Sequence, residues 1–444
     1  MRLMIAGASS GCGKTTVTLA LMAALREGGA RVAPFKTGPD YIDTGFHAVA
    51  CRRPSHNLDA HLLSWDSIRY LLSSCGADAD ISVIEGVMGF YDGSDAVSLR
   101  CSSYELARET ATPVLLAVDA AGGAASVAAQ VLGFQRMTQD NTIAGVIVNR
   151  ASSAHHYELV RAAVEHYTGL PCVGWLRKDA RLGFDSRHLG LVPAGELPEL
   201  RAQLSLAAEL AREGLDLPMI ERIAAGAPEL PRGECEMTRY LSEHPHALDG
   251  MRIGVPRDET FGFYYQACLD ALRMAGAELI EFSPMRDAGL PQGINALYIG
   301  GGFPEVFAEQ LEGNASMRGS VRAALEGGMR CYAECGGLIY LSRGIGGRAM
   351  TGFLPLECRM TDRLQRFGYV EVRDESGLSF PAHEFHHSLA EPVGDVRCAF
   401  DICRPSAPDR HWQCGYTRLN TLAGYPHIHF WSRHELMVRL LGRA

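Results

Sequence analysis

The sequence Ala8-Ser-Ser-Gly-Cys-Gly-Lys-Thr-Thr16 follows the apolar run Leu3–Ala6 and precedes a stretch with a helical pattern. This order predicts a buried strand, a glycine-rich turn and a helix that begins near Lys14. The backbone N–H groups of such a turn, together with the helix N-terminus, form a concave site for phosphate groups. Lys14 is then expected to reach the β- and γ-phosphates of ATP, and the Thr15 hydroxyl to ligate Mg²⁺. The residues expected to contact the nucleotide in this turn are Gly11, Cys12, Gly13, Lys14, Thr15 and Thr16.

The strict form of this motif has glycine at the position of Ala8, so the turn is a variant of it. The alternative is a merely tight glycine turn with an exposed lysine. The intact core Gly11–Thr16, and its place between a strand and a helix, favour the nucleotide site.

Length and composition narrow the class of protein. A chain of 444 residues is too long for a single core, so two or three domains are expected. Its 47% of hydrophobic and 21% of charged residues are ordinary for a globular protein. No apolar run reaches the length of about 18 residues that a membrane span needs, and the N-terminus lacks the pattern of a signal peptide. We therefore expect no membrane association.

Cysteine usage and net charge bear on the compartment and the partners. The 13 cysteines are scattered and odd in number, and none forms a C-x-x-C pair. This distribution predicts reduced thiols in a cytoplasmic protein rather than a disulfide framework or a zinc site. A net charge of −9 gives no reason to expect a nucleic-acid partner.

The order of strands and helices predicts two α/β domains. In the first part, apolar strands alternate with helical stretches such as Val17–Glu27 and Ser126–Gln139, which indicates a doubly wound, mainly parallel sheet with ligands at the carboxyl ends of its strands. The candidate strands are Leu3–Ala6, Val32–Phe35, Ile81–Ile84, Val114–Val118, Thr142–Val148 and Cys172–Trp175. We expect a nucleotide-binding domain over residues 1–225, a linker over 226–250 and a second α/β domain over 251–444.

Three polar segments follow strands of the first domain. Lys36 is a candidate to neutralise a transferring phosphoryl group, and Asp40 and Asp43 to hold a metal or orient a nucleophile. Glu85 ends a strand, which is the position of an acid that holds Mg²⁺. The same segment continues to Asp92, and Asn149 at a later strand end is a candidate to read the nucleotide base. Each segment could also be an ordinary turn or helix cap, but their placement after alternate strands favours a common site.

A second candidate site lies in the C-terminal half. Cys335 stands between an apolar strand and a helix, flanked by small residues, as a nucleophile does on a strained turn. A helix N-terminus is expected to stabilise its thiolate, and the loop Gly300–Gly302 to supply oxyanion-binding N–H groups. A base is offered by His427 or His429, which alternate on a predicted strand and so share a face; spacing alone does not choose between them. The histidine spacing of His383–His387 fits no zinc pattern.

Eight motifs in order carry a resemblance that extends over nearly the whole chain. These motifs are A-S-S-G-C-G-K-T-T, F-K-T-G-P-D-Y-I-D, E-G-V-M-G-F-Y-D-G, S-R-H-L-G-L-V-P-A, Y-I-G-G-G-F-P-E, A-E-C-G-G-L, M-T-D-R-L-Q-R-F-G-Y and H-E-F-H-H-S. Taken together they resemble the cobyrinate a,c-diamide synthase family, glutamine-dependent ligases of cobalamin biosynthesis. The N-terminal half is similar to the dethiobiotin synthetase type of P-loop fold, and the C-terminal half to class I glutamine amidotransferases.

The resemblance implies that ATP phosphorylates a peripheral carboxylate of a corrin-ring acid and that ammonia from glutamine displaces the phosphate. It places Cys335 as the nucleophile and His427 as its activator, while His429 stands where an amidotransferase normally has the acid of its triad. The remaining residues that fall on the phosphoryl-transfer motifs are Lys14, Thr15, Lys36, Asp43, Glu85 and Asp92. The residues expected to contact substrates are Asp40, Tyr41, Arg187, Arg363, Gly301 and Gly302.

Alternatives stay open at this stage. The same architecture serves the amidation of hydrogenobyrinate or nickel sirohydrochlorin, and no residue indicates the ring metal. A different class is a P-loop nucleotide switch with an inactive amidotransferase module, which predicts loss of the cysteine or of its histidine; both are present. The expected partners are small molecules, namely a tetrapyrrole acid, ATP and glutamine, and a homodimer is left open.

Overall fold

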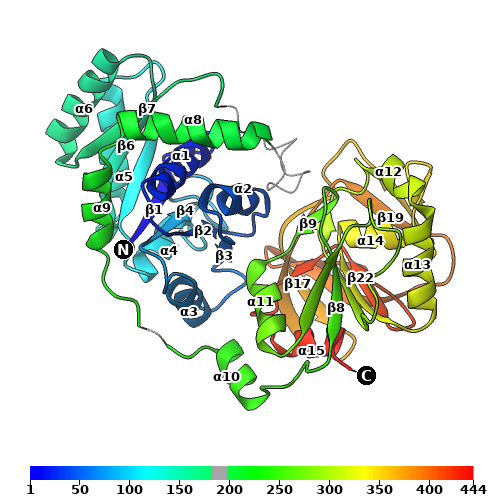
Figure 1. Ribbon diagram of the computed structural model, residues 1–444. Coiled ribbons are helices and arrows are strands. Elements are labelled where there is room, and N and C mark those ends of the chain that lie inside the picture. The colour runs from blue at the N-terminus through cyan, green and yellow to red at the C-terminus, as the bar shows by residue number, and fades with distance from the viewer. Residues whose placement is uncertain (183, 185–197, 232, 444) are drawn as a thin grey trace. The chain divides into compact units, whose positions relative to one another are not determined.

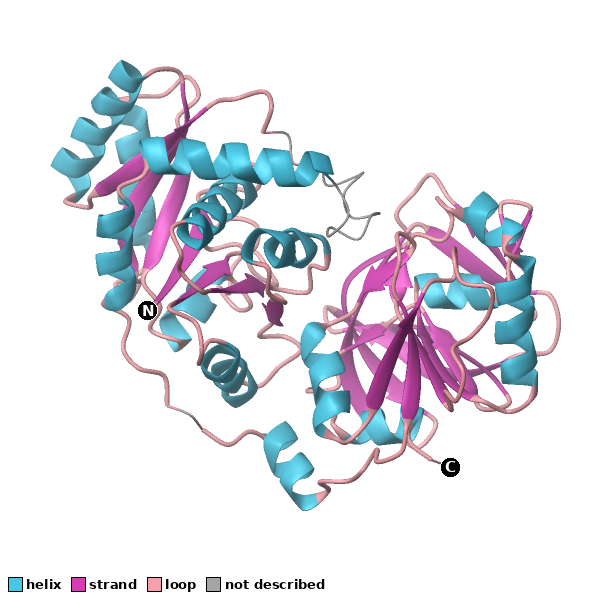
Figure 2. Ribbon diagram, viewed as in Figure 1, coloured by secondary structure: helices cyan, strands magenta, loops and turns pink. Residues whose placement is uncertain are grey.

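The computed structural model describes residues 1–182, 184, 198–231 and 233–443. The chain divides into two compact units, of which the first comprises most of residues 1–234 and the second residues 235–444 with the short stretch 61–63. Each unit has its own sheet and its own helices (Figures 1 and 2).

The first unit is built on a seven-stranded sheet in which every neighbouring pair is parallel, in the order β3-β2-β4-β1-β5-β6-β7. Most strand residues are buried, as expected for a parallel sheet with both faces covered. The order changes direction between β4 and β5 around β1, which places the turn after β1 at a switch point where such sheets bind ligands. The strands are β1 Arg2–Gly7, β2 Val32–Thr37, β3 His56–Leu58, β4 Ile81–Glu85, β5 Val114–Asp119, β6 Ile143–Ala151 and β7 Cys172–Arg177.

Helix α1 (Lys14–Glu27) is the most deeply buried helix element of this unit's core. Residues Val17–Leu25 are all buried, because α2, α8 and α9 contribute side chains to the same apolar cluster. This explains why α1 is apolar around most of its circumference. The other helices of the unit are α2 Ile42–Cys51, α3 Trp65–Cys75, α4 Ser103–Glu109, α5 Ala125–Met137, α6 Ala154–Thr168, α8 Pro198–Gly214 and α9 Leu217–Ala225.

The sequence-based expectations for this unit are confirmed for the parallel α/β sheet and for all six candidate strands. Strand β3 was not predicted, because it has only three residues, two of them polar. Within the stretch 226–250, for which the sequence indicated a linker, the structure has the helix α10 (Glu236–Glu243).

The second unit contains a ten-stranded mixed sheet in the order β10-β8-β11-β13-β22-β21-β20-β17-β18-β23. The pairs from β10 to β22 are parallel and those from β22 to β23 antiparallel. Strands β11 and β13 are therefore parallel neighbours, and the loops after them leave the same edge of the sheet. The strands are β8 Arg252–Pro256, β10 Glu278–Phe282, β11 Ala296–Ile299, β13 Arg330–Glu334, β17 Arg366–Asp374, β18 Ser379–His386, β20 Arg397–Arg404, β21 Ala407–Arg418, β22 Thr421–Gly424 and β23 His427–Ile428.

Two small sheets and, besides α10, five helices complete the described part of this unit. One sheet pairs β9 with β12, and the other has the order β15-β14-β16-β19. Apolar runs of the sequence at 252–256, 278–282, 296–299, 329–333 and 368–372 predict strands, and these coincide with β8, β10, β11, β13 and β17. The remaining elements are β9 Phe261–Phe263, β12 Gly301–Gly302, β14 Gly344–Ile345, β15 Arg348–Ala349, β16 Leu356–Met360, β19 Ser388–Pro392, α11 Gln266–Met274, α12 Ala308–Gly313, α13 Ala315–Glu326, α14 Gly336–Leu341 and α15 Glu435–Leu441.

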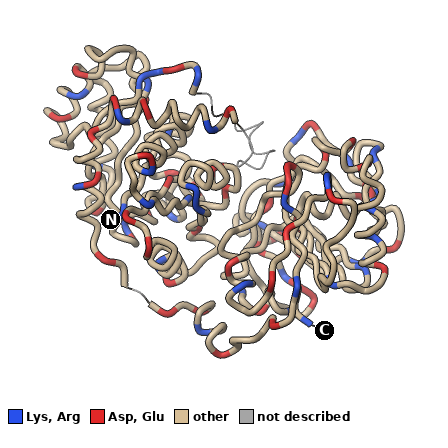
Figure 3. The backbone as a smooth tube through the Cα atoms, in the orientation of Figure 1, with Lys and Arg blue, Asp and Glu red and all other residues tan. Residues whose placement is uncertain are grey.

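Three further features are the distribution of charged residues, the hydrophobicity of the helices and the state of the cysteines. Lys and Arg residues are interspersed with Asp and Glu residues along the backbone of both units (Figure 3). No helix in the described ranges is long and apolar enough to cross a bilayer. All 13 cysteines are free thiols.

Candidate functional site

The glycine-rich turn after β1 has the backbone that its sequence predicts. Gly11 and Gly13 have φ angles of 77° and 89°, in the left-handed region that side chains disfavour. The turn therefore requires glycine at both positions. Cys12 between them is buried, and α1 begins at Lys14, so that Lys14, Thr15 and Thr16 form its first turn.

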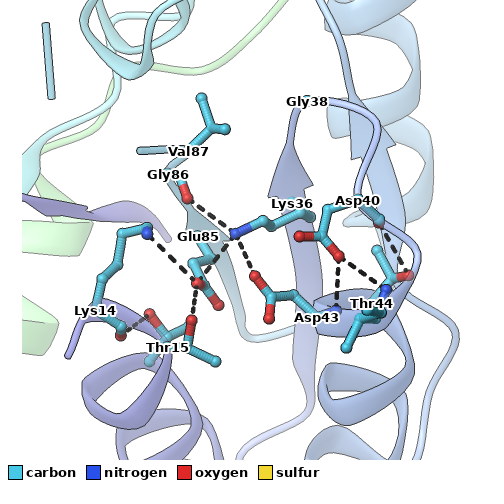
Figure 4. A network of polar contacts seen from close by, with 12 residues as sticks. Lys14, Thr15, Lys36, Gly38, Asp40, Asp43, Thr44, Glu85, Gly86 and Val87 are labelled. Atoms are coloured by element: carbon cyan, nitrogen blue, oxygen red, sulfur yellow. Dashed lines mark hydrogen bonds and ion pairs between the residues drawn. The ribbon is translucent and has the colours of Figure 1, made fainter. Parts of the chain in front are cut away.

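A network of polar contacts converges on Glu85, the last residue of β4. Thr15 Oγ1 donates to Glu85 Oε1 over 2.7 Å, and Lys36 Nζ lies 3.1 Å from the same oxygen. Lys14 Nζ lies 3.9 Å away. Figure 4 shows these three side chains pointing toward the Glu85 carboxylate. Because the neighbouring strands β1, β2 and β4 are parallel, their carboxyl ends bring residues from three sequence motifs to one point.

The second oxygen and the lysine extend this network to α2. Lys36 Nζ forms an ion pair of 2.6 Å with Asp43 Oδ2, on the first turn of α2. His47 Nε2 lies 2.7 Å from Glu85 Oε2, and its Nδ1 3.3 Å from Ser55 Oγ. His47 was not among the predicted site residues. It could have been found from the sequence, because it follows Asp43 by four residues on one helix and so lies on the same face.

The charges of this network are set by burial and by one another. Burial alone would lower the pKa of Lys36, but the carboxylates of Asp43 and Glu85 raise it above its ordinary value. Burial alone would raise the pKa of Glu85, but Lys36 and His47 hold it far below its ordinary value. Burial and the charge of Glu85 raise the pKa of Asp43 to about 6, although Lys36 opposes this rise. Glu85 is thus an anion at neutral pH, and the pKa of Asp43, about 6, lies just below neutral pH.

Other predicted residues of this half take local positions. Asp40 Oδ1 accepts the backbone N–H groups of Ile42 and Asp43 at 2.8 and 2.9 Å, which fixes the start of α2 beside the Lys36–Asp43 pair. Tyr41 immediately precedes α2 and is half-buried.

Two residues lie apart from the Glu85 contacts. Asp92 Oδ2 accepts the N–H of Gly89 at 2.9 Å and closes the turn after β4. Asn149 Nδ2 donates to the carbonyl of Cys12 over 2.8 Å and so supports the glycine-rich turn from β6. Its role in reading the nucleotide base stays a prediction.

In the second unit, Cys335 occupies a strained turn between β13 and α14. Its φ and ψ are 48° and −99°, a conformation that a residue with a side chain rarely adopts. The strand therefore ends abruptly, as the nucleophile-elbow pattern predicted. Burial raises the pKa of the Cys335 thiol far above its ordinary value; nearby Glu305 adds to the rise and the N–H of Gly336 opposes it. The N–H of Gly336, at the start of α14, favours the thiolate, but burial outweighs this effect.

The glycine loop after β11 packs directly against this turn. A Cβ on Gly336 would lie 2.8 Å from the backbone N of Gly302, and one on Gly301 would lie 2.6 Å from His427 Cε1. The two glycines thus allow a close approach that any side chain would block. The loop, the turn that carries Cys335 and the imidazole of His427 belong to one cluster of the second unit.

The two candidate bases are separated by the structure. Strand β23 covers only His427–Ile428, so the alternation expected to place His427 and His429 on one face does not continue. The ring of His429 is fully buried against Tyr265, with ring centres 4.6 Å apart, and its Nδ1 accepts the N–H of Trp431. His427 is the histidine that adjoins the glycine loop.

The basic and histidine-rich candidates differ in where they lie. The histidine-rich segment of β18 adjoins the second site, because His383 pairs with His427 and Cys335 Sγ lies 4.0 Å from the carbonyl oxygen of Phe385. Arg363 is exposed on the turn before β17, and Arg187 lies outside the described residues. In the histidine cluster, burial lowers the pKa of His383 to about 3 and that of His386 to about 4, so both are neutral. His386 stacks on Tyr425 with ring centres 3.7 Å apart. The described residues contain no group of three or more His, Cys, Asp or Glu side chains arranged for a metal.

Comparison with protein families matches each unit to a domain type. Residues 3–191 match the CobQ/CobB/MinD/ParA nucleotide binding domain, and residues 252–435 the CobB/CobQ-like glutamine amidotransferase domain. A cobyrinate a,c-diamide synthase of Listeria innocua is 41% identical, with 99% of each chain covered. The chain belongs to the cobyrinate a,c-diamide synthase family.

Other relatives agree with this assignment. The synthase of Listeria monocytogenes serotype 4b is 41% identical with 99% of each chain covered, and that of Fusobacterium nucleatum is 39% identical with 98% of each chain covered. The similarity thus spans both units. As a member of this family, the chain is a glutamine-dependent ligase of cobalamin biosynthesis, and the family that the sequence motifs predicted is confirmed.

Proposed function

We propose that this enzyme converts the a and c acetate carboxylates of cobyrinate into amides, with ATP as the activating substrate and glutamine as the nitrogen donor. The observation that carries the proposal is the full-length similarity to cobyrinate a,c-diamide synthases across both units. The Glu85 network and the Cys335 turn support it, because each offers the groups that one half of this reaction needs.

The first half-reaction is activation of a carboxylate. A carboxylate is a poor electrophile, and transfer of the γ-phosphoryl group of ATP to one of its oxygens creates a leaving group. Lys14 and Lys36 supply positive charge to the transferring group, as fixed cations do in phosphoryl transfer. Asp43, Asp92, Asp40 and Tyr41 are proposed to orient the reacting groups, and Gly11–Thr16 with Asn149 to hold the nucleotide.

The Glu85 network also fits a bound Mg²⁺. Thr15 Oγ1 and Glu85 Oε1 are two hard oxygen donors 2.7 Å apart, and Mg²⁺ prefers few protein oxygens with phosphates and waters completing its shell. We propose that Thr15 and Glu85 hold Mg²⁺, directly or through water, where it supplies charge neutralisation of the phosphates. Lys36 keeps Glu85 ionised and thus able to serve as a ligand.

The second half-reaction is release of ammonia from glutamine. Cys335 attacks the amide carbon of glutamine, the thiol proton passes to His427 and on to the leaving ammonia, and a thioester forms that water hydrolyses to glutamate. Because burial disfavours a free thiolate, His427 is needed as the proton acceptor at the moment of attack. The backbone of Gly301 and Gly302 is proposed to bind the oxyanion and the glutamine. Arg187 and Arg363 are proposed to contact carboxylates of the tetrapyrrole.

The ammonia then attacks the acyl phosphate, forming the amide C–N bond and releasing phosphate. An acyl phosphate is hydrolysed readily, so its site must exclude water. Hydrogenobyrinate and nickel sirohydrochlorin are the alternative acids. A nucleotide switch with an inactive second module is disfavoured, because Cys335 and His427 are both present beside the glycine loop.

The test offers cobyrinate, hydrogenobyrinate and nickel sirohydrochlorin separately, with ATP, Mg²⁺ and glutamine. We expect two successive amidations of cobyrinate, each read by mass spectrometry as replacement of a hydroxyl by an amino group. Cys335→Ala should abolish glutamate release from glutamine and retain amidation with added ammonia. Glutamate release that is equal in the wild type and in this variant refutes the assignment of Cys335.

A further inference from the structure

Glu334, the last residue of β13, carries a buried carboxylate that none of the proposed roles uses. Only 1% of its side chain is exposed. It directly precedes Cys335, but the abrupt turn separates the directions of the two side chains. Isolated buried carboxylates are destabilising unless they are hydrogen-bonded or paired, so the partners of Glu334 are informative.

Three donors hold this carboxylate in place. Oε1 accepts the hydroxyl of Tyr332 at 2.7 Å and the backbone N–H of Ile428 at 2.9 Å, and Oε2 accepts the hydroxyl of Tyr298 at 3.3 Å. Burial raises the pKa of both tyrosines well above the ordinary value, and the charge of Glu334 adds to the rise. Both phenols therefore remain protonated donors.

The fourth neighbour of the carboxylate is the imidazole of His427. Glu334 Oε2 lies 3.7 Å from His427 Nδ1, at ion-pair distance. The other oxygen accepts the N–H of Ile428, the next residue along β23. One carboxylate thus contacts both the backbone and the ring of the histidine segment. With Nδ1 directed to Glu334, Nε2 is the ring nitrogen that can take a proton from the thiol.

The sequence position at which an amidotransferase has its triad acid is here His429, which has no carboxylate and is buried against Tyr265. We propose that Glu334 takes the place of that acid: it positions His427 through Nδ1 and stabilises the imidazolium formed when His427 accepts the proton of Cys335. The proposal rests on the proposed roles of Cys335 and His427. Glu334 is a positioning residue, since it acts through the histidine.

The experiment compares Glu334→Gln with the wild type in the full-length enzyme. Glutamine keeps the shape and an acceptor for Ile428 but removes the charge. We expect kcat for glutamate release to fall by about 100-fold or more, as loss of the orienting acid does in other triads, with KM for glutamine and amidation by added ammonia unchanged within about twofold.

Two further variants keep the test decisive. Glu334→Asp retains the charge and should recover at least about tenfold of the loss. Asp374→Asn is the control, because it removes the charge of another buried acid of the same unit. Asp374 pairs with Arg439, and its loss should leave glutamate release unchanged.

The outcomes separate the two proposals. Glutamate release within about threefold of wild type in Glu334→Gln, or equal losses in the Gln and Asp variants, overturns the role of Glu334. Parallel loss of ammonia-supported amidation indicates a structural role and overturns it as well. Full glutamate release in Cys335→Ala overturns instead the underlying assignment of the nucleophile.

Discussion

Lys36→Met tests the charge balance around Glu85. Lys36 Nζ lies 2.6 Å from Asp43 and 3.1 Å from Glu85, and only 3% of its side chain is exposed. At an effective dielectric constant of about 20, these contacts correspond to attractions of about 6 and about 5 kcal/mol. Most of this is offset by desolvation of the three groups, and removal of one partner of a buried pair costs about 3–5 kcal/mol net. We therefore expect the free energy of unfolding of the first unit to fall by about 3–5 kcal/mol at pH 8.

The loss in free energy of unfolding caused by Lys36→Met should depend on pH. Without Lys36, the carboxylates of Asp43 and Glu85 face each other, and the pKa of Asp43 rises beyond the value of about 6 that it has beside the lysine. A carboxyl whose pKa is higher in the folded than in the unfolded state opposes folding above that pKa and ceases to do so when it is protonated. The loss in Lys36→Met should therefore be largest at pH 8 and shrink as the pH falls toward 6. Asp43→Asn in the same background should recover at least about 1 kcal/mol.

The assay is differential scanning calorimetry of the full chain at pH 8 and pH 6. The transition of the nucleotide-binding unit is the one that ATP shifts upward, and a loss of 3–5 kcal/mol lowers the melting temperature of a domain of roughly 200 residues by about 6–20 °C. Arg31→Met, which removes an exposed ion pair with Asp80, is the matched control and should leave this transition nearly unchanged. A shift below about 2 °C, or equal shifts at both pH values, would refute the reasoning.

Three further predictions concern activity. Gly301→Ala should lower glutamate release by about tenfold or more, because its Cβ would lie 2.6 Å from His427 Cε1, while ammonia-supported amidation persists. Gly262→Ala is the control, because nothing lies within 4 Å of a Cβ at that position. Equal activities of the two variants would contradict the close approach of Gly301 and His427. Asn149→Ala removes a hydrogen bond to the nucleotide turn, worth about 1 kcal/mol, and should raise KM for ATP by about fivefold with KM for glutamine unchanged; an unchanged KM for ATP would argue against this support. The amidation rate should fall as the pH drops through about 6, because Asp43 takes up a proton there. If the residual activity of Asp43→Asn shows the same fall in rate at this pH, the fall is due to another group.

Sequence patterns predicted the sheet and the nucleotide site because both depend on local signals. Apolar runs marked six strands of the first unit, and glycines at positions 11 and 13 marked the turn. Lys36 and Glu85 could be brought together from the sequence because parallel strands end at one edge.

The remaining features depend on side-chain packing that spacing does not reveal. His47 on α2 contacts Glu85 at the end of β4, and Glu334 at the end of β13 contacts His427 and the N–H of Ile428 on β23. Neither contact has a fixed separation in the sequence. The raised pKa of the Cys335 thiol could not be predicted from the sequence either, because burial outweighs the effect of the local helix terminus on that pKa.

The conformation of Cys335 has a consequence for the evolution of this fold. A residue with a side chain at a φ of 48° costs about 1–3 kcal/mol relative to an unstrained position, and glycine bears no such cost. A glycine there would make a more stable protein and an inactive glutaminase. Mutational drift in a lineage that no longer needed glutamine should therefore erase the thiol first, leaving an ammonia-fed ligase on a sturdier scaffold.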